Sequence, residues 1–493
     1  FSDVHNSTNF SINVYKNSFS DRIKQISNLF HPITIGACFS HDGSGEIPGI
    51  KNRSNKWNLR GHKKRILLID KEVLKTFSSL FDSPGSDFRQ ARLLAIHSED
   101  ALNVLNKFNQ LPFKLTDIET NHYSTQHWNQ TNSQSDGTIK PHTQFAEKNS
   151  QAILSGPHYH ICNPLYKTPR SVCLLSSDYD VIDLTLINDS YLPRVNFIPN
   201  CKPVEFLRRS PKVTWGENEE SSTYYRLINR RMIGTTAERS LITSIIPKGV
   251  SHVNTSITTV IEDSLTLSTF CGLCSSLVYD FYIRSAGRGD VYAETLLGLP
   301  YIYDPRIALR SLMLNSLTKY YSELWSSAWQ DEFKFDYWTK IDHRLRNSSF
   351  SSLSQAWKQS GSLKTNFERR QALIELDVLA AIHIGINLEE LLTIYRTEFS
   401  VLRQYEENTW YDSDGRIVFT INKGLAGIGL SRAEWDEVKE TNSGAIESTV
   451  VDDTRPEGPI ERTITYEAPF DRCDRESDYR VAWTEFEKRL GKT

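Results

Sequence analysis

The feature that most constrains the fold is a change of apolar periodicity at Asp304. From this residue onward, apolar side chains recur every three or four positions, as they do on one face of an α-helix. Asp304 and the proline after it predict a capped helix start. A second helix is predicted over 366–384 and a third from Asn387, whose Glu390 has capping-box spacing. Residues 304–407 are therefore predicted to form a helical scaffold.

Residues 151–303 favour short strands over helices. Their β-branched and aromatic runs are bounded by proline, glycine and asparagine, which is typical of strands joined by turns. These runs lie at 182–187, 195–198, 240–247 and 255–261. A longer apolar stretch at 269–283 predicts a helix within this region.

The two ends of the chain have mixed patterns. Residues 121–150 lack an apolar period and predict a linker. The elements expected before it are strands at 10–15 and 65–69 and helices capped by Asp70 and Ser98. The elements expected after residue 407 are a strand at 416–421, a glycine turn at 424–429, an acidic linker at 443–459 and a helix at 478–490.

These patterns predict a mixed α+β multidomain fold. A chain of 493 residues exceeds what one hydrophobic core usually serves, so several domains are expected. The expected parts are an α/β N-terminal part at 1–120, a linker at 121–150, a β-rich domain at 151–303, a helical scaffold at 304–407 and a small acidic α+β domain at 408–493.

Composition excludes several classes of protein. With 24% charged and 39% hydrophobic residues, the chain is neither disordered nor fibrous. It has no apolar run of about 18 residues, so no transmembrane helix is expected. Seven scattered cysteines are too few for a disulfide scaffold and favour a reducing, cytoplasmic location. The chain begins at Phe1 and has its first methionine at Met232, which predicts a piece of a longer polypeptide.

Charge is unevenly distributed along the chain. Residues 406–493 contain 20 acidic and 12 basic residues, a net charge of −8, whereas residues 1–405 carry a net charge of +5. The stretch 191–260 holds 10 basic and 5 acidic residues, and arginine dominates it. Arginines interleaved with aromatic residues suit contacts with phosphates and base edges. A solvated surface with salt bridges explains the same charge equally well.

Motifs for nucleotide or metal chemistry are absent or isolated. No glycine-rich dinucleotide loop, Walker A motif or His-Glu-x-x-His motif occurs. Cys271-x-x-Cys274 stands alone in an apolar run, which favours buried thiols over a zinc site. His158-x-His160 has no third ligand nearby, which favours a polar or DNA-facing role over metal binding.

Several short motifs lie between residues 155 and 249. They are SGPHYH at 155–160, NPLYKTPR at 163–170, YLPR at 191–194, YR at 225–226, RRMI at 230–233, ERSLI at 238–242 and IIPKG at 245–249. Together they resemble the target-recognition region of large N6-adenine DNA methyltransferases. These are the type IIG-like enzymes of restriction–modification and of BREX- or DISARM-like phage defence.

The resemblance continues beyond this region. Residues 270–284 and the LLGLP motif at 296–300 are similar to the end of target-recognition domains in type I specificity subunits and type IIG enzymes. Residues 405–419 and 473–480 look like C-terminal elements of the same large proteins. The resemblance covers roughly two-thirds of the chain.

The resemblance implies sequence-specific recognition of double-stranded DNA by part of an S-adenosylmethionine-dependent adenine-N6 methyltransferase. Such enzymes need a glycine-rich S-adenosylmethionine loop and an Asn/Asp-Pro-Pro-aromatic tetrapeptide that holds the flipped adenine. The sequence contains no such glycine-rich loop. The nearest match to the tetrapeptide is the NPLY motif at 163–166, which lacks the second proline. No catalytic, cofactor-binding or metal-binding residue is therefore expected in this chain.

The resemblance also implies partners. The catalytic domain or subunit is expected upstream of Phe1, with residues 1–120 as its C-terminal edge or as a bridge. S-adenosylmethionine is implied as the cofactor of the complete enzyme. Other defence-system subunits are further expected partners, and no membrane contact is expected.

The candidate DNA contacts are mostly arginines, because arginine bonds bidentately to guanine as asparagine does to adenine. The primary candidates are Arg208, Arg209, Arg226, Arg230 and Arg231, with Lys212 and Arg239 as phosphate clamps. The secondary candidates are His158, Tyr159, Asn163, Lys167 and Arg170. Adjacent residues on a strand point to opposite faces, so either Arg230 or Arg231 is expected to pair with a carboxylate such as Glu238.

Two other functions stay open. A metal-dependent nuclease subunit would use Glu437-x-Lys439 with Asp412 or Asp414, although the surrounding residues predict a capped helix. A non-catalytic component of a phage-defence complex would bind protein rather than DNA. The acidic residues 406–493 repel phosphate, so they are expected to pack on the basic core, bind a partner subunit or occupy the DNA channel.

Overall fold

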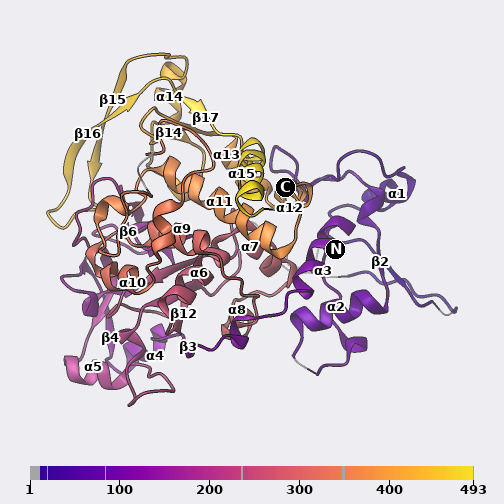
Figure 1. Ribbon diagram of the computed structural model, residues 1–493, viewed down its shortest axis with the longest axis horizontal. Helices are drawn as coiled ribbons and strands as arrows, with labels where there is room; N and C mark the ends of the chain where they lie inside the picture. Colours follow the sequence, from indigo (N-terminus) through magenta and orange to yellow (C-terminus); the bar gives the residue numbers. More distant parts are fainter. Residues whose placement is uncertain (1–10, 19, 84, 235–236, 347–349, 492–493) are drawn as a thin grey trace.

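The computed structural model describes residues 11–18, 20–83, 85–234, 237–346 and 350–491. Within these ranges the chain combines several small sheets with many helices, which confirms the predicted mixed α+β fold. Figure 1 shows helices gathered in the centre, a long β-hairpin at the upper left and the N-terminal elements at the right. None of the helices in these ranges has both the length and the apolar character needed to cross a bilayer.

The N-terminal part pairs two short strands beside three helices. Its elements are β1 (Ile23–Gln25), α1 (Ile33–Ser40), β2 (Leu67–Ile69), α2 (Lys71–Phe81) and α3 (Glu99–Asn109). Asp70 caps α2 and Ser98 caps α3 by accepting hydrogen bonds from backbone N–H groups, as predicted. The strand predicted at 10–15 does not form over 11–15, where Ile12, Val14 and Tyr15 are exposed and no strand covers them. Residue 10 lies outside the described residues.

Two four-stranded sheets form the centre of residues 121–303. One has the order β10–β9–β12–β3, and the other has the order β11–β5–β8–β4. Their strands are β3 (His122–Thr125), β4 (Ile139–Phe145), β5 (Ile153–Leu154), β8 (Arg194–Pro199), β9 (Arg226–Arg230), β10 (Thr243–Ile246), β11 (Ser251–His252) and β12 (Ser256–Ile261). The same region contains the hairpin β6 (Lys167–Pro169) with β7 (Tyr179–Val181) and the helices α4 (Gln130–Ser135) and α5 (Pro203–Arg209). The strands predicted at 195–198, 240–247 and 255–261 are confirmed.

Two predictions for this region are wrong. The expected linker at 121–150 contains β3, α4 and β4, because strands pair through backbone hydrogen bonds and do not require an apolar period. The strand expected at 182–187 is a turn, in which Asp183 accepts hydrogen bonds from the backbone N–H and the hydroxyl of Thr185. Ile182, Leu184 and Ile187 of this segment are buried in a small cluster with Leu317 instead of on a sheet, and Leu186 is exposed.

The helical region follows the predicted caps. Its helices are α8 (Ala293–Leu297), α9 (Pro305–Asn315), α10 (Ser322–Ser327), α11 (Asn366–Ile384), α12 (Leu388–Glu398) and α13 (Ser400–Glu406). Asp304 caps α9, and Gly385 ends α11 with a φ of 83° that favours glycine. Asn387 and Glu390 form the predicted capping box of α12.

The apolar run predicted as one helix over 269–283 is divided into two. α6 (Ser264–Ser275) ends and α7 (Leu277–Ser285) begins at Ser276, whose hydroxyl accepts a hydrogen bond from the backbone N–H of Tyr279. Asp377 in α11 accepts the N–H of Leu277 at 2.6 Å. The break is therefore stabilised by a buried carboxylate that is distant in sequence.

The C-terminal part combines a small sheet, a hairpin and a final helix. Its elements are β13 (Thr409–Tyr411), β14 (Ile417–Thr420), α14 (Arg432–Val438), β15 (Ala445–Asp452), β16 (Ile460–Glu467), β17 (Asp471–Arg472) and α15 (Arg475–Arg489). The acidic linker predicted at 443–459 is wrong over Ala445–Asp452, because these residues form β15, which pairs in register with β16. The exposed face of β15 carries small or polar residues, with Glu447 among them, so its alternating pattern resembles a linker.

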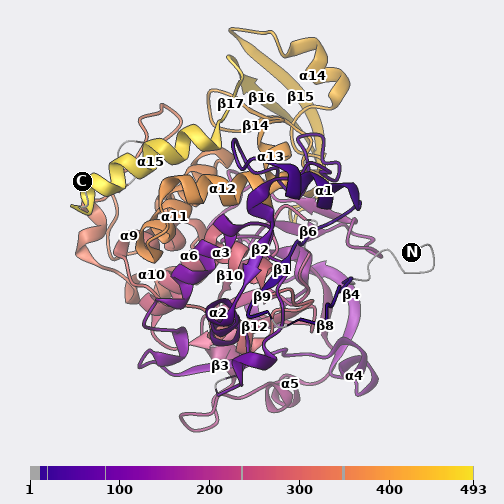
Figure 2. The same ribbon diagram turned by 90° about the vertical axis from the view of Figure 1, so that its right-hand side faces the viewer.

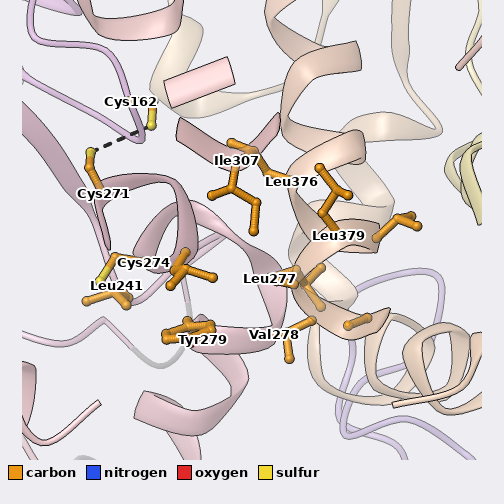
Figure 3. Close-up of a cluster of buried hydrophobic side chains, with 14 of the residues drawn as sticks. Cys162, Leu241, Cys271, Cys274, Leu277, Val278, Tyr279, Ile307, Leu376 and Leu379 are labelled. Carbon is orange, nitrogen blue, oxygen red and sulfur yellow. Dashed lines mark hydrogen bonds between the residues drawn. The ribbon is translucent and has the colours of Figure 1, made fainter. Parts of the chain in front are cut away.

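One continuous hydrophobic core joins the N-terminal, helical and C-terminal parts. It takes buried side chains from Leu67 in β2 to Phe486 in α15 and includes residues of α6, α7, α9, α11 and α12. Figure 3 shows part of it, where Cys162, Cys271 and Cys274 lie among aliphatic side chains. Cys162 Sγ and Cys271 Sγ are 3.8 Å apart and both thiols are free, and the thiols of Cys271 and Cys274 are buried as predicted. The domain boundaries stay a prediction.

Gly272 allows α6 and α9 to approach each other closely. A Cβ atom at this position would lie 2.7 Å from Ile307 Cγ2 and 3.0 Å from the Ile307 carbonyl oxygen. We expect Gly272→Ala to lower the free energy of unfolding by about 1–3 kcal/mol, because the helices must separate to admit the methyl group. In the matched control Gly36→Ala, within α1, the new Cβ meets nothing within 4 Å. Urea denaturation should show an unchanged or higher stability for the control, and equal losses in both variants would contradict this explanation.

Candidate nucleic-acid interface

Two predicted DNA contacts, Arg226 and Arg239, are buried inside the protein. Arg226 lies in β9 and donates hydrogen bonds to the carbonyl oxygens of Tyr224 and Val250. Burial lowers the pKa of Arg226 to about 9. Arg239 donates from Nε to Asp280 Oδ2 at 2.7 Å. A duplex cannot reach either guanidinium in this conformation, so the prediction for these two residues is wrong.

His158 and Tyr159 are also buried and hydrogen-bonded within the protein. The His158 ring lies with Nε2 3.1 Å from the Arg194 carbonyl oxygen and with Nδ1 3.0 Å from the Ser155 backbone nitrogen. Burial lowers the pKa of His158 to about 4, so its ring is neutral. The Tyr159 hydroxyl donates to Ser256 Oγ at 2.9 Å. Both residues hold the turn before β6 in the core and are not accessible to DNA.

Arg208, Arg209 and Lys212 lie together on the surface at and just after α5. Arg208 Nη2 lies 2.7 Å from Glu205 Oε1, and Arg209 Nε lies 2.5 Å from the same oxygen. Hydrogen bonds from Arg208 and Arg209 lower the pKa of Glu205 to about 2. Lys212 is exposed. The group is accessible to DNA, although Glu205 offsets part of its positive charge.

Arg230 and Lys167 form a half-buried cationic pair, here called the Arg230–Lys167 cluster. Arg230 is the last residue of β9 and donates from Nε to Gly156 O at 2.8 Å and from Nη2 to Tyr159 O at 2.9 Å. Lys167 is the first residue of β6, with its Nζ 5.2 Å from the centre of the Tyr166 ring. Strands that are distant in sequence therefore bring these two predicted contacts together.

No ion pair with a carboxylate neutralises the Arg230–Lys167 cluster among the described residues, although Asp180 lies near enough to raise the pKa of Lys167. Burial lowers the pKa of Lys167, and the positive charge of Arg230 lowers it further. Burial likewise lowers the pKa of Arg230. Neither cation forms an ion pair with any carboxylate in the described part of the chain, and Asp180 pairs with Arg170 instead. Two partly desolvated cations without a paired carboxylate are suited to bind an anion such as a phosphate.

His160 and Asn163 lie in the turn beside the cluster. The His160 ring centre is 4.8 Å from that of Tyr166. Burial, together with the charge of Arg230, holds the pKa of His160 well below its usual value, so the ring is neutral. Asn163 Oδ1 accepts the backbone N–H of Leu165 at 3.2 Å, which makes Asn163 a turn-forming residue in this structure.

The tip of the β6–β7 hairpin carries exposed apolar side chains. Arg170 binds Asp180 across the hairpin at 2.9 Å. Asp178 Oδ2 accepts the backbone N–H groups of Leu174 and Leu175 at 2.9 and 2.8 Å, which fixes the tip. The two leucines are 86% and 67% exposed. Sequence reasoning missed this tip, although two leucines within a serine-rich turn were its signal.

Arg231 and Met232 begin the connection from β9 to β10. Arg231 Nε lies 3.5 Å from Asp290 Oδ1, whereas Glu238 accepts a hydrogen bond from Asn422 Nδ2 at 2.9 Å. The carboxylate that pairs with an arginine here is therefore Asp290, and the prediction of Glu238 is wrong. Met232 is 71% exposed next to the half-exposed Arg231.

The tetrapeptide Asn163-Pro164-Leu165-Tyr166 is not arranged as an adenine-binding motif. Its proline, leucine and tyrosine are buried, and the Tyr166 hydroxyl donates to the Gly424 carbonyl oxygen. A flipped base could not stack on this tyrosine. These residues therefore do not fit the S-adenosylmethionine-dependent site that the resemblance implies for the complete enzyme, and no catalytic step is assigned to them.

The carboxylates considered for a nuclease do not converge. Glu437 lies on α14, and Lys439 Nζ pairs with Asp436 at 3.1 Å. Asp412 Oδ1 accepts the backbone N–H of Asp414 at 3.0 Å within its own turn. The described ranges contain no group of three or more His, Cys, Asp or Glu side chains placed to hold a metal ion.

The acidic C-terminal part packs on residues 151–303 through the end of the β15–β16 hairpin. Asp453 forms a bidentate ion pair with Arg194, with both N–O distances at 3.0 Å. The Tyr191 hydroxyl donates to the Thr454 carbonyl oxygen at 2.7 Å. Of the three roles expected for the acidic segment, packing on the core is the one that these contacts support.

Eight of the predicted DNA contacts thus keep exposed or half-exposed side chains. They are Asn163, Lys167, Arg170, Arg208, Arg209, Lys212, Arg230 and Arg231. Comparison with known proteins finds no family whose sequence pattern matches this chain and no curated protein with a significant match.

Proposed function

We propose that this chain is the sequence-specific double-stranded DNA recognition portion of an S-adenosylmethionine-dependent adenine-N6 DNA methyltransferase in a restriction–modification or phage-defence system. The observation that carries the DNA-binding part is the Arg230–Lys167 cluster, whose half-buried cations form no ion pair with a carboxylate among the described residues. The assignment to a methyltransferase rests on the resemblance of the motifs at 155–249.

The cluster supports this proposal on energetic grounds. Half-buried positive charges cost free energy unless an anion compensates them, and a backbone phosphate would do so. Arg230 is held by two carbonyl oxygens, so its guanidinium is oriented before DNA arrives. Phosphate contacts of this kind would fix the register of the duplex without reading its sequence.

The exposed tips near the cluster supply candidates for sequence reading. Leu174 and Leu175 are held out on the β6–β7 hairpin, and Met232 extends from the β9–β10 connection. Apolar side chains of this kind can contact thymine methyl groups or enter between base steps. Arg231 is the polar candidate beside them, because only a 3.5 Å contact with Asp290 holds it.

The proposal places methyl transfer outside the described residues. A catalytic domain or subunit would bind S-adenosylmethionine, and other defence-system subunits are proposed partners. The cytoplasm is the proposed location, since DNA is the proposed ligand and the seven cysteines are free thiols.

Duplex binding as a function of salt tests this proposal. We expect Lys167→Gln to weaken binding to a duplex of about 30 base pairs by about tenfold and to reduce the slope of log affinity against log salt by about 1. The matched control is Lys358→Gln, an exposed lysine in the helical region. Fluorescence anisotropy should show wild-type affinity for the control. Unchanged affinity and salt slope for Lys167→Gln would contradict the proposal. A wild-type duplex affinity that does not fall as salt rises would favour the protein-binding alternative.

A further inference from the structure

The N-terminal part carries a second concentration of positive charge. Residues 22–63 contain seven basic and two acidic residues, a net charge of +5. That excess equals the excess of the longer stretch 191–260. One of the two carboxylates, Glu46, lies 3.4 Å from Arg396 in α12. The cations of this stretch are therefore not balanced by acidic residues of their own segment.

Six of these cations define what we call the basic N-terminal surface. Five are exposed and one is half-exposed, and none forms an ion pair with a carboxylate in the ranges that the structure describes. They are Lys24, Lys51, Arg53, Lys56, Arg60 and Lys63. Exposed cations without counter-charges repel each other, and a polyanion relieves that repulsion.

A built turn presents three of the six cations. Lys51 and Trp57 form a β-bridge, and the Asn52 backbone N–H donates to the Lys56 carbonyl oxygen at 2.8 Å. The Asn52 side chain also accepts the backbone N–H of Lys56 at 3.0 Å. Arg53 lies at the tip of this turn. The positions of these cations are therefore set by hydrogen bonds within the turn.

Aromatic side chains hold the turn against the rest of the surface. Phe30 stacks on Trp57 with ring centres 3.8 Å apart and an interplanar angle of 12°. Lys51 Nζ lies 4.6 Å from the centre of the Trp57 ring. Lys24 in β1 has its Nζ 5.8 Å from the centre of the ring of Phe39, which lies on α1. All three rings are partly exposed, so cations and aromatic edges share one accessible surface.

The basic N-terminal surface is fixed to the body of the protein. The Ile50 backbone N–H donates to the Thr397 carbonyl oxygen at 3.0 Å, which ties the turn to α12. The buried Arg65 donates to the Arg60 carbonyl oxygen at 3.1 Å and to the Ser27 carbonyl oxygen at 2.9 Å. A ligand bound here would therefore keep a defined position relative to the recognition region.

Two elements that belong to or adjoin the cationic regions, α1 and β6, can be located in both views. Figure 1 places α1 and β6 at opposite ends of the long axis. Figure 2 places the same two elements on the same side, away from α15. A single duplex that lies along this side could contact both regions.

We propose that the basic N-terminal surface binds backbone phosphates of the same DNA duplex, beside the recognised site and without regard to sequence. The inference rests on the proposed function for its choice of partner. Lysines and arginines supply the phosphate contacts, and the Phe30–Trp57 stack positions Lys51 for them. No carboxylate pairs with the six cations within the described ranges, which favours a densely charged polyanion over an ordinary protein surface.

A triple variant tests the inference in the complete chain. Lys51→Gln with Lys56→Gln and Arg60→Gln should weaken binding to a duplex of about 30 base pairs by at least about tenfold and reduce the salt slope by about 2–3. The matched control removes the same charge from exposed lysines elsewhere: Lys114→Gln with Lys358→Gln and Lys488→Gln. The control should bind as the wild type does. Sequences preferred by the triple variant should be those of the wild type, because phosphate contacts carry no sequence information.

The results for the triple variant and for Lys167→Gln together distinguish failure of this inference from failure of the proposed function. If the triple variant binds duplex as the wild type does while Lys167→Gln does not, the inference is wrong and the proposed function stands. If neither variant loses affinity, both are wrong. If only single-stranded DNA binding falls in the triple variant, the surface serves single strands and the duplex inference is overturned. A triple variant that loses affinity but also changes the preferred sequence contradicts the sequence-independent role.

Discussion

Arg475→Ala is expected to lower the free energy of unfolding by about 3–5 kcal/mol, because it leaves buried carboxylates without their cation. Arg475 at the start of α15 lies 2.8 Å from Asp377 Oδ2 and 3.0 Å from Glu406 Oε1. The Tyr479 hydroxyl donates to the same Asp377 oxygen at 2.6 Å. Arg370 binds Glu406 from the opposite side at 2.7 Å. This network attaches α15 to α11 and α13, so the loss is expected to affect the whole helical core.

The pH dependence of this loss follows from the two carboxylates. Burial alone would raise the pKa of Glu406, but Arg370 and Arg475 lower it to about 2. A lowered folded-state pKa stabilises the fold above the ordinary pKa of the carboxyl, and this contribution is lost as the pH falls towards 2. Burial raises the pKa of Asp377, and Arg475 opposes that rise. In Arg475→Ala the pKa of Asp377 should therefore rise further, so the difference in the free energy of unfolding between the variant and the wild type should become smaller as the pH falls and Asp377 is protonated.

The matched control for this prediction lies on the same helix. Arg480 pairs with Glu389 at 3.0 Å, and both side chains are exposed. Arg480→Ala should cost less than about 1 kcal/mol, because exposed ion pairs contribute little. Urea denaturation of both variants at two pH values provides the comparison. A loss for Arg475→Ala no larger than that for Arg480→Ala would show that the buried network does not hold α15.

Lys167→Glu is expected to weaken duplex binding by at least about a hundredfold, which is the largest effect on binding that we predict. The substitution removes one phosphate contact and places a negative charge where the phosphate would lie. The new carboxylate would pair with Arg230, whose charge lacks such a partner among the described residues. Stability should therefore be unchanged or higher, while affinity falls.

Thermal unfolding and anisotropy together separate this effect from misfolding. Lys358→Glu makes the same change of charge at an exposed position in the helical region and should retain binding. A folded Lys167→Glu protein with wild-type affinity would remove the Arg230–Lys167 cluster from the interface. A fall of equal size in Lys358→Glu would show that only net charge matters.

Helix starts were predictable because their signals are local. Asp70, Ser98, Asp304 and Asn387 each cap a helix by accepting hydrogen bonds from N–H groups two or three residues ahead. The break at Ser276 was missed, since the Asp377 carboxylate that supports it lies 100 residues away in sequence. The strand β3 was missed for the same reason, because its partner β12 lies more than 130 residues further along the chain.

The candidate site was predictable in composition but not in accessibility. Arg226 and Arg230 lie on the same face of β9. Arg226 is buried, whereas Arg230, at the end of the strand, is only half-buried by the surrounding residues. The sequence shows the spacing of these arginines, but not which loops cover each of them. Lys167 was ranked below the arginines, although the fold places it beside Arg230 and makes it central to the site.

Selection from a random-sequence duplex library tests the central claim most directly. The complete chain would be incubated with the library at moderate salt, and bound duplexes would be recovered and sequenced. We expect the duplexes bound by the wild type to share a short sequence motif. The amount of duplex that the wild type binds should fall steeply as salt rises, and Lys167→Glu should bind almost none of these duplexes. Recovery without an enriched motif, or equal enrichment by Lys167→Glu, would contradict sequence-specific recognition through the Arg230–Lys167 cluster.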